Sequence, residues 1–421
     1  MSVVSQIQAC RLCGSAVSGT ALSLGDQPIS NRLPLQGDGD GTAPVYPLNI
    51  VVCTSCGLPQ LEHNLAAEEH FHDDYTYVSG ASSTWVEHCR DYAGQLVRDF
   101  GLGPGDLVVE AGSNDGTLLR FFAEAGVRVL GVEPSGNVAE IARASGIPTL
   151  TAFFNEETAR NIVESQGRPK LFIGNNVLAH VPDTDGFLQA ARDLITHDGA
   201  LCFEFPHFTR ILTHRYFDTI YHEHYCYLGV GPLSAWAKTH GMVVADVQPQ
   251  STHGGSLRLF LEKQGRPVGE AAQGRIDRYL AEESELAGAA PWQQLEHWLG
   301  DWRSRFRGTV SELRSAGKTV AAYAAASKAT VLSNYLGLTA NDVEWCCDAS
   351  PLKQGRLIPG ANIPIVVPAT LRDDPPDAII AFAWNIFDEI ADVVAANVVQ
   401  ETLLIRPLPE IETRTVGGGA Q

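Results

Sequence analysis

The stretch "VVEAGSNDGTLLRFF", residues 108–122, decides the fold of this chain. A short run of branched apolar residues leads into a glycine-containing turn, and residues with helical spacing follow the turn. Glycines at this place let the backbone approach a ligand at the carboxyl end of a strand. The stretch therefore predicts the first strand, turn and helix of a doubly wound α/β domain.

The same turn indicates which ligand it binds. It is not the G-x-G-x-x-G sequence of dinucleotide-binding folds, and it has no basic residue to hold a pyrophosphate. It is acidic at both ends, which suits a ligand with positive charge, such as the sulfonium and ammonium of S-adenosylmethionine. We expect that cofactor, with NAD as the alternative. The expected contacts are Glu110, Gly112, Asn114, Asp115 and Gly116.

Two later strand ends complete the predicted cofactor site. Glu133 ends the run "VLGVEP", where a carboxylate is placed to accept two ribose hydroxyls. The stretch "NNVLAHVPD" ends a later strand, and Asn175 and Asn176 there can reach the methionine end of the cofactor.

Strands and helices alternate on both sides of this site. Through residues 76–265, short apolar runs alternate with helical stretches, which predicts a parallel, doubly wound sheet. Residues 266–317 are polar and aromatic with helical spacing, and we expect them to connect two domains. A second series of buried strands, from "TVAAYA" to "TLLIRP", predicts another α/β domain at residues 318–421. Residues 1–75 are rich in loops and have few apolar residues for a core.

Four of the nine cysteines form two C-x-x-C pairs in that first block. Each pair places two thiolates on a tight turn, and two such turns that face each other make a closed zinc site. A block with a small core needs such a staple. We therefore predict a structural zinc ion without an open coordination position, with redox pairs as the alternative. The predicted ligands are Cys10, Cys13, Cys53 and Cys56.

The net charge of the chain indicates which classes of partner it can bind. With 30 basic and 49 acidic residues the formal charge is −19, which argues against broad binding to nucleic acid or to anionic membranes. The first residues have no signal-peptide pattern, and no apolar run approaches the roughly 20 residues that span a bilayer. C-x-x-C pairs in a chain without a leader favour reduced thiols. We expect a cytoplasmic protein, with a monomer as the working assumption.

The stretch "FDTIYHEHYCYLG", residues 217–229, places two histidines and a glutamate between tyrosines. Such a cluster can bind a metal, move protons or simply form hydrogen bonds. A metal site is disfavoured, because neighbouring positions alternate faces and the run is not H-E-x-x-H. If the backbone is extended, His222 points away from Glu223 and is structural. An exposed polar turn is the remaining alternative.

This stretch and several others resemble one known family. The resemblance covers nearly the whole chain, and the other matching stretches are the two cysteine pairs, "YTYVSGASSTW", "EAGSNDGTLL", "NNVLAHVPD", "THGGSLRLFLE", "DASPLKQGRLIPGANIPI" and "AFAWNIFDEI". The chain resembles the S-adenosylmethionine-dependent C-methyltransferases that act on nucleotide-linked keto-deoxysugars. The resemblance implies a small zinc domain, a class I Rossmann-like methyltransferase domain and a C-terminal Rossmann-like domain. It also implies methylation at C3 of a TDP-linked 4-keto sugar, while C5 and other nucleotides stay open.

The resemblance further implies which residues are catalytic: Tyr75, His180, Tyr221, Glu223 and His224. Methylation of a carbon next to a ketone requires removal of a weakly acidic proton and stabilisation of the enolate oxygen. An imidazole with a pKa near ~6.5 is a suitable base, and we assign this role to His224. We expect Glu223 to orient a neighbouring imidazole or a sugar hydroxyl. His180 and Tyr221 are expected to donate hydrogen bonds to the keto oxygen, and Tyr75 is expected to close the site over the sugar.

By the same resemblance, the C-terminal domain helps to bind the sugar nucleotide. Lys328 opens an expected helix just after a strand, a usual place to meet a phosphate. On a later loop we favour Arg356 over Lys353 as a second pyrophosphate partner. Asn385 follows another strand, where ligands of open α/β sheets gather. One motif departs from the family: in "YAAASKAT", alanines stand where glycines are expected.

Two functions of other kinds stay open. A non-catalytic zinc protein that senses a sugar nucleotide would bind its ligand without methyl transfer. An RNA methyltransferase with a zinc ribbon is disfavoured by the acidic charge.

Overall fold

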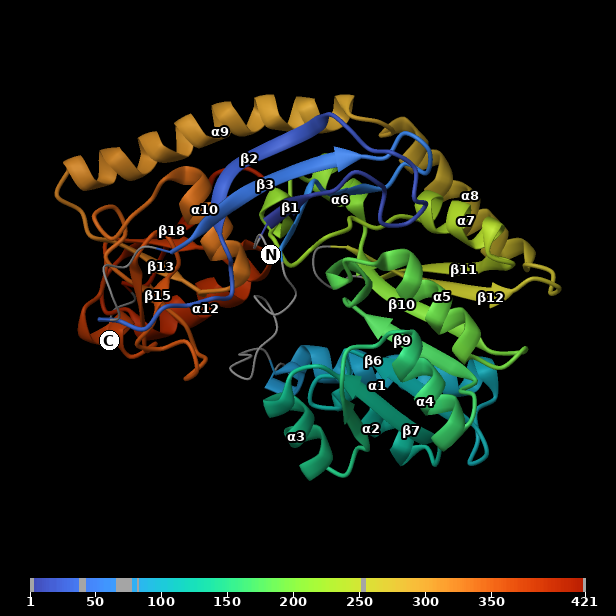
Figure 1. Ribbon diagram of the computed structural model, residues 1–421. Helices are drawn as coiled ribbons and strands as arrows, with labels where there is room; N and C mark the ends of the chain where they lie inside the picture. Colours follow the sequence, from blue (N-terminus) through green and yellow to red (C-terminus); the bar gives the residue numbers. More distant parts are fainter. Residues whose placement is uncertain (1–3, 38–42, 66–77, 82, 251–254, 419–421) are drawn as a thin grey trace.

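Figure 1 shows the computed structural model, which describes residues 4–37, 43–65, 78–81, 83–250 and 255–418. Tyr75, one of the expected catalytic residues, lies outside the described residues. The described strands form two seven-stranded sheets, one three-stranded sheet and one two-stranded sheet. The fold is thus mixed α/β with two Rossmann-like sheets, which confirms the predicted fold class. Within the described residues, no helix has the length and apolar character of a membrane span.

The quoted stretch folds as predicted, because β6 (Leu107–Ala111) leads through the turn into α2 (Thr117–Glu124). In spatial order, the first large sheet consists of β11 (Met242–Gln250), β12 (Ser256–Lys263), β10 (Ala200–Pro206), β9 (Leu171–Asn175), β6, β7 (Arg128–Glu133) and β8 (Thr149–Thr151). The strands from β10 to β8 are parallel, but β12 is antiparallel to both of its neighbours. The connection from β11 to β12 is short, and a short connection can join only antiparallel strands.

Helices cover both faces of this sheet. Val108 in β6 packs into a cluster with α1 (Ser83–Phe100), α2 and α3 (Gly136–Ala144). Its neighbours Leu107 and Val109 pack on the opposite face with α4 (Glu156–Gln166), α5 (Thr184–Leu194) and α7 (Val230–Thr239). Burial on both faces explains why these strands are nearly continuous apolar runs.

The second large sheet lies in the C-terminal part of the chain. In spatial order its strands are β15 (Leu357–Ile358), β16 (Ile363–Val366), β14 (Cys346–Cys347), β13 (Val320–Tyr323), β17 (Ala378–Ala381), β18 (Thr402–Arg406) and β19 (Glu412–Val416). The inner strands are parallel and both edge strands are antiparallel. Its helices are α10 (Ser327–Leu336), α11 (Thr370–Asp373) and α12 (Phe387–Asn397).

The N-terminal residues form the two small sheets. β1 (Val4–Gln6) pairs with β5 (His63–Leu65), and β2 (Thr20–Pro28), β3 (Val45–Val52) and β4 (Pro59–Leu61) form an antiparallel sheet. In Figure 1 the long helix α9 (Ala290–Ser315) runs along β2, and α8 (Glu270–Glu285) precedes it on the side of the first large sheet.

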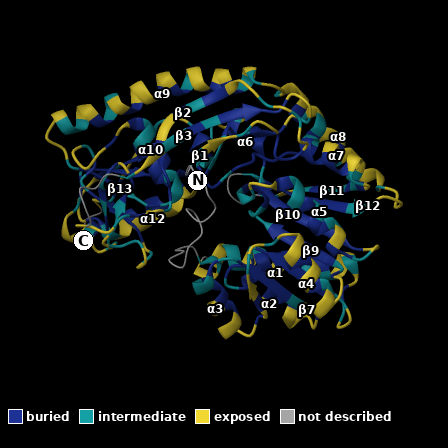
Figure 2. Cartoon of the chain, in the orientation of Figure 1, coloured by how far each residue is buried: buried dark blue, intermediate teal, exposed yellow. Residues whose placement is uncertain are grey.

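One hydrophobic cluster joins all these parts. It runs from Leu22 in β2 through Phe203 in β10 to Ile405 in β18. Figure 2 accordingly shows buried segments in each sheet and exposed segments on the outer sides of the helices. Because the parts share a core, side chains from all of them can be held at fixed positions in one site.

Candidate active site

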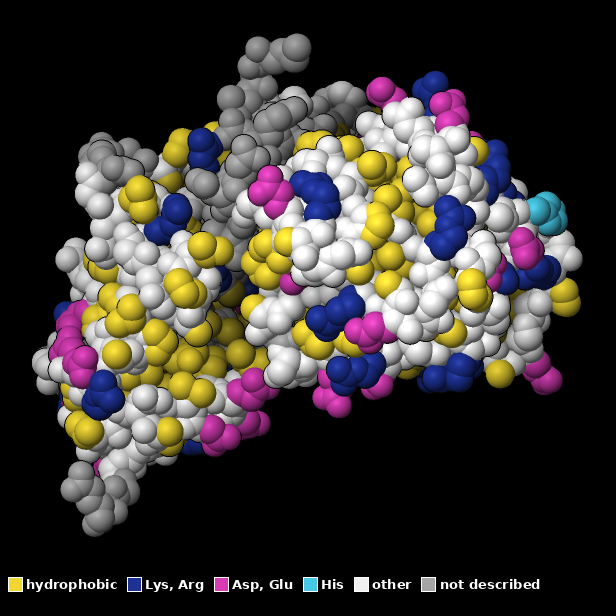
Figure 3. Space-filling model, turned by 90° about the horizontal axis from the view of Figure 1, so that it is seen from below, with side chains coloured by type: hydrophobic (Ala, Val, Ile, Leu, Met, Phe, Trp, Pro, Cys, Tyr) yellow, Lys and Arg dark blue, Asp and Glu magenta, His cyan; other side chains and the backbone are white. Residues whose placement is uncertain are grey.

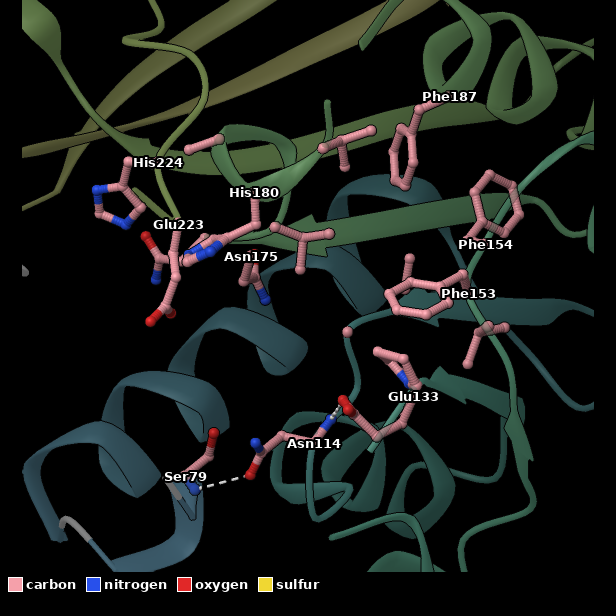
Figure 4. A pocket seen from close by; sticks show the side chains of 18 of the residues that line it. Ser79, Asn114, Glu133, Phe153, Phe154, Asn175, His180, Phe187, Glu223 and His224 are labelled. Carbon is pink, nitrogen blue, oxygen red and sulfur yellow. Dashed lines mark hydrogen bonds between the residues drawn. The ribbon is translucent and has the colours of Figure 1, made fainter. Parts of the chain in front are cut away.

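A cavity of about 1850 Å³ lies where the parts of the chain meet. Its lining includes Asn31 from the N-terminal part, Gly112 and His224 from the middle part, and Lys328 from the C-terminal part. The surface is indented between the two large lobes in the view of Figure 3, and Figure 4 shows the cavity wall from close by. Ligands of open α/β sheets bind at the carboxyl ends of the parallel strands, and the cavity lies there in both large sheets.

The turn after β6 requires glycine. Gly112 has a φ of +61°, and a Cβ atom on it would lie 2.3 Å from Val177 Cγ2. Gly116 has a φ of +77° at the start of α2 and packs against Ile147. Only Gly112 of the two lines the cavity. The glycines thus bring the backbone of the turn against its neighbours, and the approach of a ligand to this backbone stays a prediction.

Glu133 lies buried on the cavity wall at the end of β7. Its two carboxylate oxygens accept hydrogen bonds from the backbone N–H groups of Asn114 and Ser135, each at 2.9 Å. Figure 4 shows the bond from Asn114. These bonds fix the carboxylate, and each oxygen keeps one lone pair for a ligand hydroxyl. Asn114 itself has a φ of +50°, and its side chain accepts a hydrogen bond from Ser79 N at 2.9 Å.

Two buried acceptors on the cavity wall near the turn, Asn175 Oδ1 and Asn176 Oδ1, have no donor among the described residues. Burial, and next the charge of Asp115, raise the pKa of Glu110 well above its ordinary value. Both asparagines line the cavity, and Asn175 Nδ2 donates to the carboxylate of Glu110 behind it at 3.4 Å. Acceptors without donors suit a ligand that carries positive charge and N–H groups. This arrangement fits the ammonium and sulfonium of S-adenosylmethionine.

Three of the expected cofactor contacts, Glu110, Asp115 and Gly116, do not line the cavity. Glu110 lies behind Asn175. The Asp115 carboxylate accepts hydrogen bonds from Gly80 N at 2.8 Å and from the Thr117 hydroxyl at 2.6 Å. Asp115 therefore stabilises the start of α2. Because it does not line the cavity, it can act on a bound cofactor only through the electrostatic field of its carboxylate.

The far end of the cavity is aromatic, which the sequence reading missed. Phe153 and Phe154 follow β8, and Phe187 comes from α5 (Figure 4). The ring centroids of Phe154 and Phe187 are 5.0 Å apart. Phe153 lines the cavity and is 47 % exposed. The signal was the pair "FF" directly after a strand end.

The stretch at residues 217–229 is held in place by backbone hydrogen bonds. Tyr225 N donates to Ala179 O at 2.7 Å, which places His224 next to His180, with ring centroids 4.6 Å apart. His224 N donates to Tyr221 O at 2.9 Å, so the backbone here is a turn and not the extended strand we assumed. The side chain of His222 is buried away from the cavity, 3.2 Å from Tyr46 O, and burial lowers its pKa to about 4.

The hydrogen bonds of His224 define its tautomer. Nδ1 lies 2.8 Å from the carbonyl oxygen of Thr219, and a carbonyl can only accept. The neutral imidazole therefore carries its proton on Nδ1, and Nε2 keeps a lone pair. Nε2 lies 2.8 Å from the hydroxyl of Tyr221, which donates to it. Such an imidazole, oriented through one nitrogen and basic at the other, can accept a proton from a substrate.

Glu223 lies next to this pair and is only 2 % exposed. Burial raises its pKa to about 7, and a hydrogen bond from Asn31 Nδ2 to Glu223 Oε1 at 2.7 Å acts in the opposite direction. The cavity wall therefore holds a carboxyl group that changes charge near neutral pH. Asn31 was missed in the sequence because it lies in a loop 192 residues away.

The C-terminal wall of the cavity carries two lysines. Lys328 follows the first residue of α10, 4.4 Å from the ring centroid of Trp384, and Nζ lies 3.4 Å from Asn385 Oδ1. Lys353 also lines the cavity, 3.6 Å from Asp348. Arg356 does not line it, because its guanidinium donates to the carbonyl oxygens of Leu33 and Leu352. The preference for Arg356 over Lys353 is therefore not supported by their positions.

The four expected zinc ligands come together. All four Sγ atoms lie within 4.8 Å of one another, and Cys10–Cys56 and Cys13–Cys53 are 3.6 Å apart. A tetrahedron with Zn–S bonds of about 2.3 Å has sulfur–sulfur edges of about 3.8 Å, so the donor set fits zinc. Gln60 Nε2 donates to Cys10 Sγ at 3.2 Å and supports the site from outside. The four protein ligands leave no position for a substrate.

Comparison with known proteins identifies relatives of the whole chain. Family models match residues 10–71 ("Putative zinc binding domain"), residues 85–247 ("Methyltransferase domain") and residues 251–409 ("C-methyltransferase C-terminal domain"). The chain is 34% identical over 415 residues to C-methyltransferase NovU from Streptomyces niveus, a match that covers 97% of each chain.

Solved structures share similarity with part of the chain. One is magnesium protoporphyrin IX methyltransferase from Synechocystis PCC 6803, with 19% identity, a TM-score of 0.33, and 42% of this chain and 79% of that chain covered. Another is the CcbJ methyltransferase from Streptomyces caelestis, with 12% identity, a TM-score of 0.33, and 42% and 90% covered. At these scores the assignment to a family rests on the relative from S. niveus and on the family models.

Proposed function

The chain belongs to the family of S-adenosylmethionine-dependent C-methyltransferases, and on that basis we propose that it methylates a nucleotide-linked 4-keto-deoxyhexose. Its cofactors are S-adenosylmethionine and a zinc ion bound by four cysteines. We assign the new methyl group to C3 and the nucleotide to TDP. Methylation at C5, or another nucleotide, is the nearest alternative.

The observation that carries this proposal is the geometry of His224. Its Nδ1–H is fixed by the carbonyl oxygen of Thr219, and Nε2 faces the hydroxyl of Tyr221 on the cavity wall. The base lies in the same cavity as the glycine turn, Asn175 and Asn176. A sugar between them would have its acidic carbon near both the imidazole and the cofactor site.

The chemistry then needs two events at this wall. Nε2 of His224 accepts the proton from the carbon next to the ketone, and the electrons of the broken C–H bond form an enolate. In this step the Tyr221 hydroxyl turns its one proton from Nε2 to the enolate oxygen. Hydrogen bonds from His180 and Tyr221 then stabilise that oxygen, and each positioned donor contributes about 3 kcal/mol. The cofactor supplies the methyl group from its sulfonium, and the C–S bond breaks as the new C–C bond forms. Tyr75 keeps its proposed place over the sugar on the family resemblance alone.

The C-terminal wall supports the nucleotide part of the substrate. Two lysines, Lys328 and Lys353, face a cavity in a protein with a formal charge of −19. A pyrophosphate has the charge and the acceptors that these ammonium groups prefer. Asn385 lies beside Lys328 and is proposed to contact the same ligand.

Incubation with S-adenosylmethionine and a panel of 4-keto sugar nucleotides tests this proposal. We expect a mass gain of one methylene unit and carbon attachment by NMR. In substrate incubated with the enzyme without the methyl donor, we expect exchange of solvent deuterium at the carbon that would be methylated. His224→Asn should keep both ligands bound and lose about 10²–10⁴-fold in turnover. His197→Asn, an exposed histidine outside the cavity, is the matched control.

Other outcomes point to other functions. Transfer of the methyl group to oxygen or nitrogen, or an active His224→Asn, contradicts the enolate mechanism. Binding of the sugar nucleotide without any methyl transfer would favour a non-catalytic sensor. A cytoplasmic location remains part of the proposal, on the same reasoning from the cysteine pairs.

A further inference from the structure

A side chain from the N-terminal part of the chain links two walls of the cavity. Asn31 Nδ2 donates to Glu223 Oε1 at 2.7 Å, and Asn31 Oδ1 accepts from the Ser327 hydroxyl at 2.8 Å. One amide therefore connects the proposed catalytic stretch to the first residue of α10. Because an ionised carboxylate can only accept, the amide has one orientation that satisfies both partners.

The backbone around Asn31 is tied to the same helix. Thr330, one turn further along α10, donates from its hydroxyl to the carbonyl oxygen of Ser30 at 3.1 Å. Ser30 and Thr330 are both buried, at 2 % and 1 % exposed. A displacement of the first turn of α10 therefore moves both the backbone at residue 30 and the side-chain amide at residue 31.

The first turn of α10 is also where we propose that the pyrophosphate binds. Ser327 is directly followed by Lys328, and both line the cavity. We propose that Asn31 is a positioning residue that holds the carboxylate of Glu223 in place and couples it to nucleotide binding at the start of α10. This inference rests on the proposed function, because it takes the nucleotide site and the role of Glu223 from it.

The coupling between nucleotide binding and Glu223 can be measured as a change in the number of protons that Glu223 binds. Burial raises its pKa to about 7, and the Asn31 hydrogen bond lowers it from an even higher value. Titratable side chains on the same cavity wall are His180, Tyr221 and His224 from the middle part and Lys328, Asp348 and Lys353 from the C-terminal part. Loss of the Asn31 amide should leave Glu223 protonated at neutral pH. A ligand that tightens the link should release a proton from it.

Calorimetry with TDP-glucose tests the coupling without turnover. Its pyrophosphate diester does not titrate near neutral pH, so proton release measured in two buffers of different ionisation enthalpy comes from the protein. We expect release near pH 7 in the wild type, a clear loss of it in Asn31→Leu, and a partial loss in Ser327→Ala, which keeps the bond to Glu223. Asn31→Ser serves as a second variant if Asn31→Leu does not fold.

The pH dependence of kcat provides the second readout. In Asn31→Leu the acidic limb should move up by about one pH unit, so that kcat falls about fivefold at pH 7, where wild-type Glu223 is about half ionised, and recovers well above pH 8. A role in folding alone would lower activity equally at all pH values, and that result overturns the inference. Equal proton release in wild type and variant also overturns it. Failure of the wild type to bind TDP-glucose would instead count against the proposed function.

Discussion

Glu223 should reduce the stability of the folded enzyme above neutral pH, and Glu223→Gln should remove this penalty. The carboxyl group is 2 % exposed, and burial raises its pKa from 4.5 to about 7. The folded state therefore keeps a proton on Glu223 at pH values where the unfolded chain has lost it. Stability from this group is highest below its ordinary pKa and declines as the pH rises toward the raised pKa.

The magnitude follows from the two pKa values. The difference of about 2.5 pH units, at 1.36 kcal/mol each, gives a full penalty of about 3 kcal/mol well above pH 7. At about pH 5 the penalty is only about 1 kcal/mol, because this pH is only slightly above the pKa of 4.5 that Glu223 has in the unfolded chain. Glutamine still accepts the hydrogen bond from Asn31 but never ionises. The gain in stability from Glu223→Gln should therefore be about 2 to 3 kcal/mol larger at about pH 8.5 than at about pH 5.

Urea denaturation, monitored by tryptophan fluorescence, measures the unfolding free energy of both proteins at the two pH values. Both proteins need saturating zinc at both pH values, so that metal loss does not contribute. Glu157→Gln is the matched control, because Glu157 is an exposed residue of α4, and its effect should be the same at both pH values. A Glu223→Gln variant whose change in unfolding free energy is independent of pH would refute the reasoning. The variant should also lose activity, which would show that the penalty is retained for function.

Three further predictions concern other parts of the molecule. Cys13→Ser, or removal of zinc with a chelator, should lower the free energy of unfolding by about 3 kcal/mol or more. Loss of the metal should also reduce turnover, because Arg11 lies between Cys10 and Cys13 and its guanidinium lies 5.3 Å from the centroid of the Tyr225 ring. Thermal denaturation with metal analysis measures the stability, and a methyl-transfer assay measures the turnover. Unchanged stability in the metal-free protein contradicts this prediction. Lys328→Met should weaken TDP binding about tenfold in calorimetry, since a hydrogen bond from a charged group contributes about 1.5 kcal/mol or more; equal affinity would place the pyrophosphate elsewhere. Ala324→Gly should raise the free energy of unfolding by about 1 kcal/mol in urea denaturation, because Ala324 has a φ of +70°, and a loss of stability would contradict this.

Local patterns in the sequence predicted the features that depend on neighbouring residues. The turn at residues 112–116 follows from glycine spacing, and the zinc ligands follow from two C-x-x-C pairs. The alternating strands of both large sheets are apolar because both faces are buried. The antiparallel β12 was outside this reading, since it depends on the short connection from β11.

Contacts between distant segments could not be predicted in the same way. Asn31 lies in an ordinary loop, and its role depends on partners at residues 223 and 327. Arg356 and Lys353 have the same charge and nearly the same place in the sequence, but only Lys353 lines the cavity. His222 was expected to point away from Glu223 if the backbone is extended; it is buried away from the cavity, although the backbone there is a turn. Which side chain of a loop faces a ligand is set by the tertiary fold.

The stretch at residues 217–229, which holds the proposed base, is attached to all three parts of the chain. Within it, Asp218 accepts a hydrogen bond from the indole of Trp384 at 2.5 Å, and Trp384 in turn carries Lys328 above its ring. At the other end, Tyr225 donates its hydroxyl proton to Leu65 O at 2.9 Å.

Between these anchors, backbone bonds to Ala179 hold the stretch against the methyltransferase sheet. The proposed base is therefore positioned by three separate attachments, to the N-terminal, middle and C-terminal parts. A methyltransferase domain on its own would keep the cofactor turn but lose two of these attachments, together with Asn31 and both lysines. In this proposal the N-terminal and C-terminal parts complete the active site, and a change at any one of the three attachments should affect the orientation of His224.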